Sequence, residues 1–281
     1  MVADPPTSGS LAFPDGVVRR IEAFAVDGDV VQPCIRDLIE EHPLRIVVNG
    51  APAATLMQTP GNEVALALGF LLTEGLVRRV ADVAAITYCR EGELGTAGEV
   101  QVRLNGEPQP PIQQRYREVF SSCSLCGLEL IEAYADDLST LDRAPGRLRT
   151  EDVFALRDAM DGVQALYRQT GGSHAAALAE LPVAGDGAVV GEDIGRHNAL
   201  DKAVGLAAHL GLQFDRCLLM LSGRPSLEMV AKAARAGLSD VAAVGAPSAL
   251  GVDLARRLGM FLAGFVRGRA MTVYAGIEAL A

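Results

Sequence analysis

The chain has 281 residues, 49% of them apolar and 21% charged, which suffices for one large or two modest cores and excludes collagen, coiled coil and disorder. Acidic residues outnumber basic ones by 35 to 25, and the formal charge of −10 opposes binding to nucleic acid or anionic lipid. No apolar stretch approaches the ~20 residues of a membrane helix. The five cysteines are too few for a secreted disulfide framework, and an odd number cannot all pair. We expect a cytoplasmic protein without a membrane or nucleic-acid partner.

The residues that open the chain, MVADPPTSGSLAFPDG, carry no signal-peptide pattern and indicate a disordered leader over residues 1–18. Strand patterns dominate the region that follows. A β-branched run over 44–48 ends in Asn49-Gly50, which is typical of a type I′ hairpin turn and predicts a return strand over 54–58. Further strands are predicted over 83–88 and 99–104.

Helix signals occur at three places before residue 170. Thr59 and Pro60 are a typical N-cap and first helical residue, and they predict a helix to Leu72 with a glycine stop at Gly75. Thr150 predicts the cap of a helix that runs to about Arg168. Between them, an aperiodic loop over 121–127 precedes a helical pattern over 128–138.

From residue 170 onward, apolar runs alternate with amphipathic ones. Strands are predicted over 174–178, 188–192, 216–221, 241–245, 260–265 and 271–275. Helices are predicted over 199–209, 226–236 and 248–258. This alternation is typical of crossover units and predicts a layered α/β/α domain, with a boundary between residues 120 and 150.

The loop that begins with two serines holds Cys123 and Cys126 in a CxxC spacing, just before a predicted helix. A cysteine at a helix N-terminus has a lowered pKa, and its thiolate can attack sulfur. A second cysteine three residues on can resolve a persulfide or disulfide, or share a metal. The spacing alone leaves a sulfur carrier, a thiol redox site and half of a structural zinc site open. A second zinc-binding half is missing from the sequence. Cys34, Cys89 and Cys217 stand alone and are expected to be structural.

A second constellation lies at the predicted strand-to-helix turn of GEDIGRHNALDKAVG. Asp193, Arg196, His197 and Asn198 fall at the turn itself, and Asp201 and Lys202 follow in the first helical turns. So many polar groups at one turn indicate a site. A capped helix with a salt-bridged face is the alternative.

Three further segments carry candidate binding residues. The loop from Ser222 to Ser226, which contains Arg224, and the loop from Gly245 to Ser248 each follow an apolar strand, where open α/β sheets hold ligands. His174 enters a strand of small residues and is either a core histidine or a ligand contact. Arg267 and Arg269 flank a glycine between two strands, which suits a phosphate, although a solvated hairpin turn has the same pattern.

Six stretches carry a family resemblance. They are SSCSLCG (121–127), TGGSHAAAL (170–178), GEDIGRHNALDKAVG (191–205), LSGRPSLEMVAKAARAG (221–237), GAPSALGVDLARRLGM (245–260) and GFVRGRAMTVYA (264–275). In this order and spacing the chain closely resembles the formate dehydrogenase accessory sulfurtransferase family, FdhD. NGAPAATLMQTPGNEVALALGFLLTEG (49–75) extends the likeness into the N-terminal half.

Proteins of that family accept sulfur from a cysteine desulfurase. They hand it to the molybdenum cofactor in its bis(molybdopterin guanine dinucleotide) form, so that formate dehydrogenase receives a sulfurated metal. The resemblance implies that Cys123 bears the persulfide, that Cys126 is its partner, and that the protein holds no metal of its own. It also implies a cofactor-binding stretch, for which GDP is an analogue of the nucleotide end. That stretch matches Phe265, Val266, Arg267, Gly268, Arg269 and Ala270.

The same resemblance implies a cytidine-deaminase-like α/β/α layered domain over residues 126–281. A smaller β-rich N-terminal domain over 19–125 is then expected to end in the CxxC loop. Deamination itself is excluded, because Ala176 stands where the H-x-E motif needs its glutamate and the CxxC lies upstream. A homodimer would suit a cofactor with two nucleotides. Ser124 replaces the glycine that is usual after the first cysteine, which restricts the loop. A zinc-stabilised or non-catalytic cofactor-binding chaperone of a molybdoenzyme is the alternative function.

Overall fold

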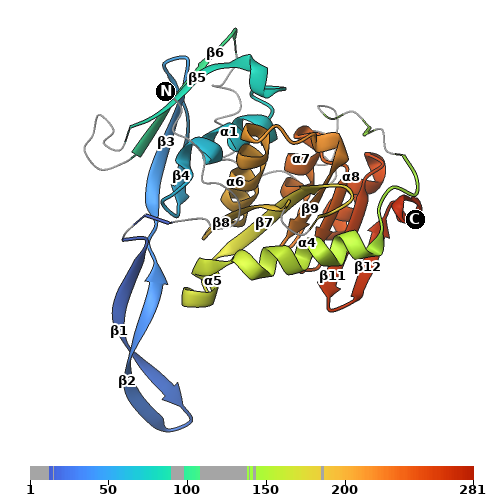
Figure 1. Ribbon diagram of the computed structural model, residues 1–281. Coiled ribbons are helices and arrows are strands. Elements are labelled where there is room, and N and C mark those ends of the chain that lie inside the picture. The colour runs from blue at the N-terminus through green and yellow to red at the C-terminus, as the bar shows by residue number, and fades with distance from the viewer. Residues whose placement is uncertain are drawn as a thin grey trace.

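A computed structural model describes residues 13, 14, 16–89, 98–107, 138, 140, 141, 144–184 and 187–281 (Figure 1). These residues form a mixed α/β fold with three sheets. The strands are β1 (Val18–Asp27), β2 (Val30–Ile39), β3 (His42–Val48), β4 (Ala51–Gln58), β5 (Val83–Cys89), β6 (Gly98–Leu104), β7 (His174–Glu180), β8 (Val189–Asp193), β9 (Cys217–Leu221), β10 (Asp240–Ala243), β11 (Phe261–Arg267) and β12 (Ala270–Ala275). The helices are α1 (Glu63–Thr73), α4 (Thr150–Val163), α5 (Ala165–Thr170), α6 (Arg196–His209), α7 (Leu227–Arg235) and α8 (Ala249–Arg257). None of the helices in these described ranges is long and apolar enough to cross a membrane.

A four-stranded sheet in the order β4-β3-β6-β5 contains the predicted hairpin. β3 and β4 are antiparallel, and the two turn residues between them, Asn49 and Gly50, have φ angles of 49° and 80°. Positive φ at both central residues is the requirement of a type I′ turn, so this prediction is confirmed. The predicted strands over 83–88 and 99–104 are β5 and β6, and they pair with each other.

The first two strands were not predicted. β1 and β2 pair antiparallel over their full length and form a separate ribbon that projects from the body (Figure 1). Its tip and much of both faces are exposed to solvent, so the alternation of apolar and polar residues that marks a half-buried strand is missing. Val17, which falls within the predicted leader, is buried, and its carbonyl oxygen accepts a hydrogen bond from the Glu40 amide.

Helix α1 ends as predicted but begins later. Asn62, with a φ angle of 60°, precedes the first helical residue Glu63, so Thr59 is not the N-cap. The hydroxyl of Thr59 instead accepts a hydrogen bond from the amide of Ile194, 135 residues away. The Thr59 side chain therefore makes a tertiary contact and does not cap the helix as the local pattern predicts. Gly75, with a φ angle of 68°, follows the helix as expected.

The six-stranded sheet has the order β12-β11-β10-β9-β7-β8. β9, β10 and β11 are parallel and are connected through α7 and α8, which confirms the predicted crossover units. β7, β8 and β12 run antiparallel to their neighbours, so the sheet is mixed. All six strands and the three helices that were predicted beyond residue 170 are present, with bounds that differ by a few residues.

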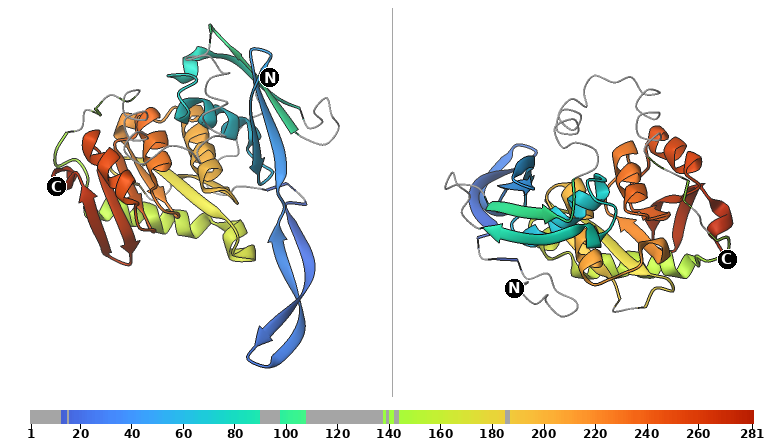
Figure 2. Two further views of the ribbon diagram at one scale, coloured as in Figure 1. Left: turned by 180° about the vertical axis from the view of Figure 1, so that it is seen from behind. Right: turned by 90° about the horizontal axis from the view of Figure 1, so that it is seen from above.

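Helices cover both faces of this sheet (Figure 2). Alternate residues of β9 divide between two cores: Leu219 and Leu221 face the core that contains α1, α6, α7 and α8, whereas Leu218 and Met220 face the core that contains α4. A strand that is apolar at every position is what burial on both faces requires.

The helix predicted over 150–168 is two helices, α4 and α5, separated at Gln164. The physical reason is Glu192, which is 1% exposed and accepts hydrogen bonds from the amides of Leu166 and Tyr167 at 3.2 and 2.7 Å. These amides are free to donate because the chain starts a new helix there. The cap of α4 is also one residue earlier than predicted, at Arg149.

α1 joins the N-terminal half of the chain to the larger sheet by packing on α6. A Cβ atom on Gly69 would lie 1.8 Å from the carbonyl oxygen of Asp201, and one on Gly205 would lie 1.9 Å from that of Ala65. Each helix thus presents a glycine to the other's backbone, and one core runs through both halves. The expected domain boundary at 125–126 lies outside the described residues.

Candidate functional site

The carboxyl ends of β9, β10 and β11 meet at one edge of the six-stranded sheet. Their loops begin at Ser222, Val244 and Gly268. β7 runs in the opposite direction, so its first residue, His174, lies at the same edge and pairs with Asp193 at the end of β8. The structure therefore brings together five segments that the sequence singled out separately, and we take this edge as the candidate site.

The loops at this edge are in backbone contact with one another. A Cβ atom on Gly245 would lie 2.8 Å from the carbonyl oxygen of Gly223, and one on Gly251 would lie 2.7 Å from that of Pro225. The amide of Phe265 donates to the carbonyl oxygen of Gly245 at 3.3 Å. Glycine is needed where backbones approach this closely, and the contacts fix the three loops relative to one another.

The predicted cofactor-binding stretch occupies the end of β11 and the turn into β12. Phe265 has a φ angle of 53°, rare for a large side chain, and the pairing of β11 with β12 shifts register between Gly264 and Arg267. The bulge leaves Phe265 43% exposed while Val266 is fully buried. Strained backbone that presents an aromatic ring to solvent is typical of a binding site.

The two arginines of this stretch contact different rings. The guanidinium of Arg267 lies 5.9 Å from the ring centroid of Phe265. That of Arg269 lies 5.6 Å from the ring centroid of Phe154 on α4. Both arginines, Gly268 and Ala270 are exposed in the β11–β12 turn, which is the geometry of a solvated hairpin as well as of a phosphate contact.

His174 and Arg196 lie beside each other at the centre of the edge. The Nδ1 atom of His174 is 3.5 Å from the hydroxyl of Ser222, which accepts a hydrogen bond from the amide of Ala175. Burial, and then the positive charges of Arg196 and His197, lower the pKa of His174. The guanidinium of the half-buried Arg196 makes no hydrogen bond or ion pair with another side chain or carbonyl group that the structure describes. A neutral imidazole and an unpaired guanidinium thus face this edge together. Arg224 is exposed in the Ser222–Ser226 loop.

Most of the polar residues of the 191–205 motif are structural. Asp193 and Lys202 are fully buried and form an ion pair at 2.7 Å. Lys202 also donates to the carbonyl oxygen of Thr59, whose amide donates back to Asp193 at 3.0 Å. Asn198 donates to both Asp193 and the carbonyl oxygen of Met57. This cluster holds the end of β4 against the start of α6. These residues therefore fit the alternative of a capped, salt-bridged helix and not a ligand site.

Asp201 belongs to a second buried cluster. Lys232 contacts it at 2.8 Å and contacts Glu74 at 2.9 Å, while the hydroxyl of Thr73 donates to Asp201 at 2.7 Å. These side chains come from α1, α6 and α7 and fix the three helices together. Only Arg196 and His197 of the motif remain at the sheet edge, where His197 lies 3.0 Å from Glu228 and holds the pKa of that carboxyl below its usual value.

Cys123 and Cys126 lie outside the described residues, as does Ser124. Of the lone cysteines, Cys217 is buried, and burial raises the pKa of its thiol to about 12, which suits an inert core residue. Cys34 is half-buried, whereas Cys89 is exposed at the end of β5.

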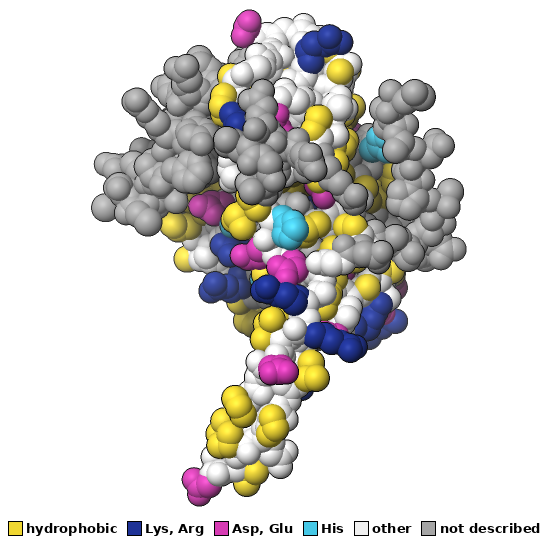
Figure 3. Space-filling view, turned by 90° about the vertical axis from the view of Figure 1, so that its left-hand side faces the viewer, with side chains coloured by type: hydrophobic (Ala, Val, Ile, Leu, Met, Phe, Trp, Pro, Cys, Tyr) yellow, Lys and Arg dark blue, Asp and Glu magenta, His cyan; other side chains and the backbone are white. Residues whose placement is uncertain are grey.

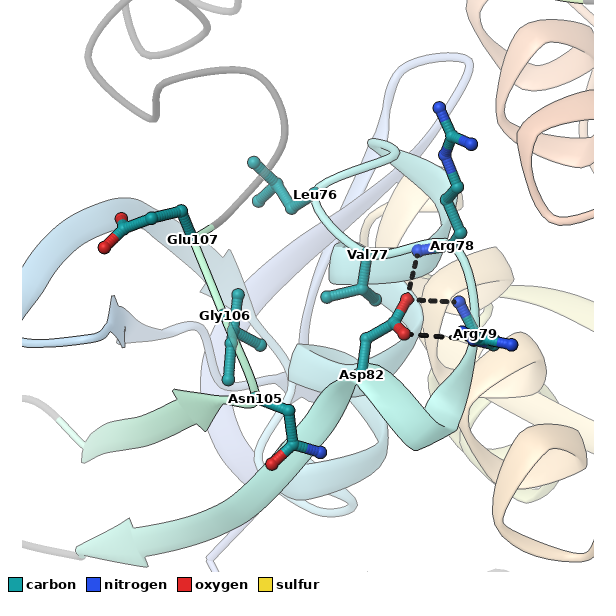
Figure 4. A pocket seen from close by; sticks show the side chains of 9 residues that line it. Leu76, Val77, Arg78, Arg79, Asp82, Asn105, Gly106 and Glu107 are labelled. Atoms are coloured by element: carbon teal, nitrogen blue, oxygen red, sulfur yellow. Dashed lines mark hydrogen bonds and ion pairs between the residues drawn. The ribbon is translucent and has the colours of Figure 1, made fainter.

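A pocket of about 580 Å³ lies away from this edge, and no sequence motif predicted it (Figure 4). Its lining comes from the segment after α1 and from the end of β6. Within it, the carboxylate of Asp82 accepts hydrogen bonds from the amides of Arg78 and Arg79 and from the Arg79 guanidinium. Because these polar groups satisfy one another, the pocket is a weaker candidate than the sheet edge.

Comparison with known proteins decides the family. The family model described as FdhD/NarQ matches residues 39–281. The chain belongs to the FdhD/NarQ family. It is 41% identical over 273 residues to a protein of Streptomyces avermitilis named sulfur carrier protein FdhD, covering 94% of this chain and 96% of the relative. It is 42% identical over 262 residues to a protein of the same name from Anaeromyxobacter dehalogenans, covering 88% and 89%.

A solved structure shows the same fold. It is the crystal structure of a candidate formate dehydrogenase accessory protein from Desulfotalea psychrophila, with a TM-score of 0.74 and 22% identity. The likeness covers 94% of this FdhD/NarQ chain and all of that one. The family expected from the sequence motifs is therefore confirmed.

Proposed function

We propose that this protein is a sulfur carrier that acts in formate dehydrogenase maturation. It receives persulfide sulfur from a cysteine desulfurase and delivers it to the bis(molybdopterin guanine dinucleotide) form of the molybdenum cofactor, which is its substrate. The observation that carries the proposal is end-to-end similarity, at about 40% identity, to relatives named sulfur carrier proteins, together with the CxxC spacing of Cys123 and Cys126.

The chemistry begins with thiol–persulfide exchange. The thiolate of Cys123 attacks the outer sulfur of the desulfurase persulfide, and the desulfurase cysteine leaves as a thiolate, so no net oxidation occurs. Cys126, three residues on, can then attack the inner sulfur of the Cys123 persulfide. The S–S bond of the persulfide breaks, its outer sulfur leaves as sulfide for the cofactor, and a Cys123–Cys126 disulfide remains that two equivalents of an external thiol must reduce.

The sheet edge suits the nucleotide end of the substrate. Phe265 offers an exposed ring for a base, and Arg267, Arg269 and Arg196 offer cationic donors on a chain whose net charge is −10. Gly268 leaves the backbone of the turn accessible. We therefore assign the stretch from Phe265 to Ala270 to this end of the cofactor, with GDP as the probe.

Three further assignments accompany this function. The helices on both faces of the six-stranded sheet support a cytidine-deaminase-like larger domain. A homodimer provides two nucleotide sites for a cofactor with two nucleotides. We place the protein in the cytoplasm, because its proposed partners are a cysteine desulfurase and the precursor of formate dehydrogenase.

The test is a sulfur-transfer assay on the purified protein. Incubation with a cysteine desulfurase and radiolabelled cysteine is expected to label the chain, and the label is expected to move to the molybdenum cofactor when the latter is added. Zinc content is measured on the same sample, before and after chelator treatment. Near-stoichiometric zinc, loss of folding on chelation and an unlabelled chain would instead identify the chaperone alternative.

A further inference from the structure

Thr59, in the N-terminal half of the chain, is joined to the candidate site by hydrogen bonds. It follows β4 and is fully buried, so it acts only through its neighbours. Its hydroxyl, amide and carbonyl groups all bond to residues of the 191–205 motif. The hydroxyl accepts from the amide of Ile194 at 3.0 Å, and the amide donates to Asp193 at 3.0 Å. The carbonyl oxygen accepts from the ammonium group of Lys202 at 2.6 Å.

The turn that receives these bonds spans residues 193–198 and is short. Only two residues separate Asp193, at the end of β8, from Arg196, the first residue of α6. One carboxylate oxygen of Asp193 accepts from the amide of Gly195 at 2.9 Å and from the side-chain amide of Asn198 at 3.1 Å. The other oxygen accepts from Thr59. Linked hydrogen bonds in a buried network strengthen one another, and this network fixes the backbone from which Arg196 projects.

The side chain of Arg196 depends on that backbone for its position. Its guanidinium has no hydrogen-bonding or ion-pair partner among the side chains and carbonyl groups of the described ranges. The contacts of Arg196 are made by its aliphatic stem. A Cβ atom on Gly223 would lie 3.6 Å from the Cβ of Arg196 and 3.6 Å from Nδ1 of His174. The stem therefore packs at the sheet edge, while the charged group stays without a partner of its own.

Two arginines at the base of the ribbon formed by β1 and β2 show the contrast. Arg19 lies 2.7 Å from a carboxylate oxygen of Glu40, and Arg20 lies 3.5 Å from one of Asp37. Figure 3 shows basic and acidic side chains close together around that base. Their charges already have carboxylate partners, whereas the charge of Arg196 is available to an anionic ligand.

We propose that Thr59 is a positioning residue for the site at the sheet edge. It holds the 193–198 turn so that Arg196 projects beside His174 and meets the anionic group of the ligand. Binding groups must be held within about 0.5 Å of their productive geometry by the residues that support them. The inference rests on the proposed function, because the anion is a phosphate at the nucleotide end of the cofactor. It gives the N-terminal half of the chain a part in binding that ligand.

A second buried threonine offers a matched control. Thr73, on α1, is also fully buried, and its hydroxyl donates to Asp201 at 2.7 Å and accepts from Lys232 at 3.0 Å. Asp201 lies on α6, more than one turn beyond Arg196. Thr73 thus joins the same two halves of the chain through the same helix, but away from the 193–198 turn. Valine at either position removes a buried hydroxyl and keeps the branched shape of the side chain.

Two measurements on the full-length protein test the proposal. Calorimetric titration with GDP gives the affinity. NMR of the imidazole protons gives the pKa of His174, which burial and then the charges of Arg196 and His197 lower. Both of these charges lie on the turn that Thr59 holds. The NMR measurement needs no ligand and therefore does not depend on the proposed function.

Thr59→Val is expected to change both quantities. A guanidinium that is displaced from its anion loses a charge-assisted hydrogen bond, so GDP is expected to bind about tenfold more weakly. The pKa of His174 is expected to rise, in the direction that Arg196→Ala produces. Thr59→Ser keeps the hydroxyl and is expected to behave like wild type. Thr73→Val is expected to change neither quantity. Urea denaturation shows whether each variant is folded.

Asn198→Ala tests the same turn without altering Thr59. The side-chain amide of Asn198 donates to the carbonyl oxygen of Met57 at 2.7 Å, so its removal releases another contact between β4 and the turn. Weaker GDP binding and a raised pKa of His174 are again expected. This variant provides the test if Thr59→Val does not fold.

A folded Thr59→Val protein with the GDP affinity and the His174 pKa of wild type would overturn the proposal. Equal changes in Thr73→Val would also overturn it, because they would show a general loosening between the two halves of the chain. A pKa of His174 that rises in Thr59→Val alone, in a protein whose wild type does not bind GDP, would support the positioning of Arg196 and contradict the nucleotide assignment. The two failures are therefore distinguishable.

Discussion

The guanidinium of Arg267 lies 5.9 Å from the ring centroid of Phe265, a residue held at a φ angle of 53° at a bulge in β11. The pair forms an exposed aromatic and cationic surface beside the loops of β9 and β10. Positive φ in a phenylalanine costs about 1 to 3 kcal/mol, and the surrounding loops hold it there.

Loss of Arg267 and Arg269 is expected to weaken GDP binding. Charge-assisted hydrogen bonds to phosphate contribute about 1.5 to 3 kcal/mol each, so the Arg267→Ala, Arg269→Ala variant is expected to bind GDP at least tenfold more weakly by calorimetry. Arg103→Ala, at an exposed arginine on β6, shows how far the loss of one positive charge elsewhere on the chain affects GDP affinity. Unchanged affinity in the folded double variant would move the nucleotide to the loop at Ser222–Ser226 or to the turn that holds Arg196.

Two glycine-to-alanine changes in helices are expected to act in opposite directions. Gly162→Ala in α4 meets open space and is expected to raise the free energy of unfolding by up to about 1 kcal/mol through helix propensity. Gly69→Ala places its Cβ 1.8 Å from the carbonyl oxygen of Asp201, and is expected to lower the free energy of unfolding by about 3 kcal/mol or more. Urea denaturation measures both. Similar stability of the two variants would show that α1 and α6 are not in close contact.

The buried pair of Lys232 and Asp201 is expected to respond to pH when it is broken. Burial raises the pKa of Asp201, and Lys232 opposes that rise. Lys232→Met removes the opposing charge and is expected to cost about 3 to 5 kcal/mol at neutral pH. The pKa of Asp201 then rises further, and the folded state binds a proton that the unfolded state has lost. The variant should therefore lose stability as the pH rises from about 4 towards 7.

Asp201→Asn in the Lys232→Met background is the control for that experiment. It removes the buried charge, so denaturation midpoints are expected to recover in part and to lose the added dependence on pH. If the single variant showed the same pH profile as wild type, Asp201 would not be the group left without its partner.

His174 is expected to titrate below its ordinary pKa of about 6.5, because burial and then the charge of Arg196 disfavour its protonated form. A depressed histidine pKa lowers the stability of the folded state as the pH falls below about 6.5. Arg196→Ala is expected to move the pKa back upward, as followed by NMR of the imidazole protons. An unchanged pKa of His174 in the Arg196→Ala variant would show that the charge of Arg196 does not act on the imidazole.

The parts of the fold that could be predicted are those with a local signal. Asn49-Gly50 determined a hairpin through its turn chemistry, and the buried strands from β7 to β12 were evident from apolar runs between amphipathic helices. The ribbon of β1 and β2 has no such pattern because neither face is buried against a core. The start of α1 and the break before α5 could not be predicted, since Thr59 and Glu192 act on residues more than 20 positions away.

Part of the candidate site could likewise be predicted from the sequence, and part could not. The turn around Arg267 and the loops after β9 and β10 could be located from the sequence, because their positions at strand ends follow from strand order. The 191–205 motif is polar for two different reasons, and the sequence does not separate them. Four of its residues make buried contacts that hold secondary-structure elements together: Asp193, Asn198, Asp201 and Lys202. Arg196 and His197 instead lie at the edge of the sheet. Burial distinguishes these groups, and burial depends on partners from the N-terminal half of the chain.

The most direct test of the sulfur-carrier account is the location of the transferred sulfur. After incubation with a cysteine desulfurase and cysteine, intact mass spectrometry without reductant is expected to show one added sulfur atom on wild type. Peptide analysis is expected to place it on Cys123. Cys89→Ala, which removes an exposed cysteine on β5, should load like wild type, and Cys123→Ala should not load. A folded Cys123→Ala protein that carries the added sulfur at the wild-type level would contradict the account.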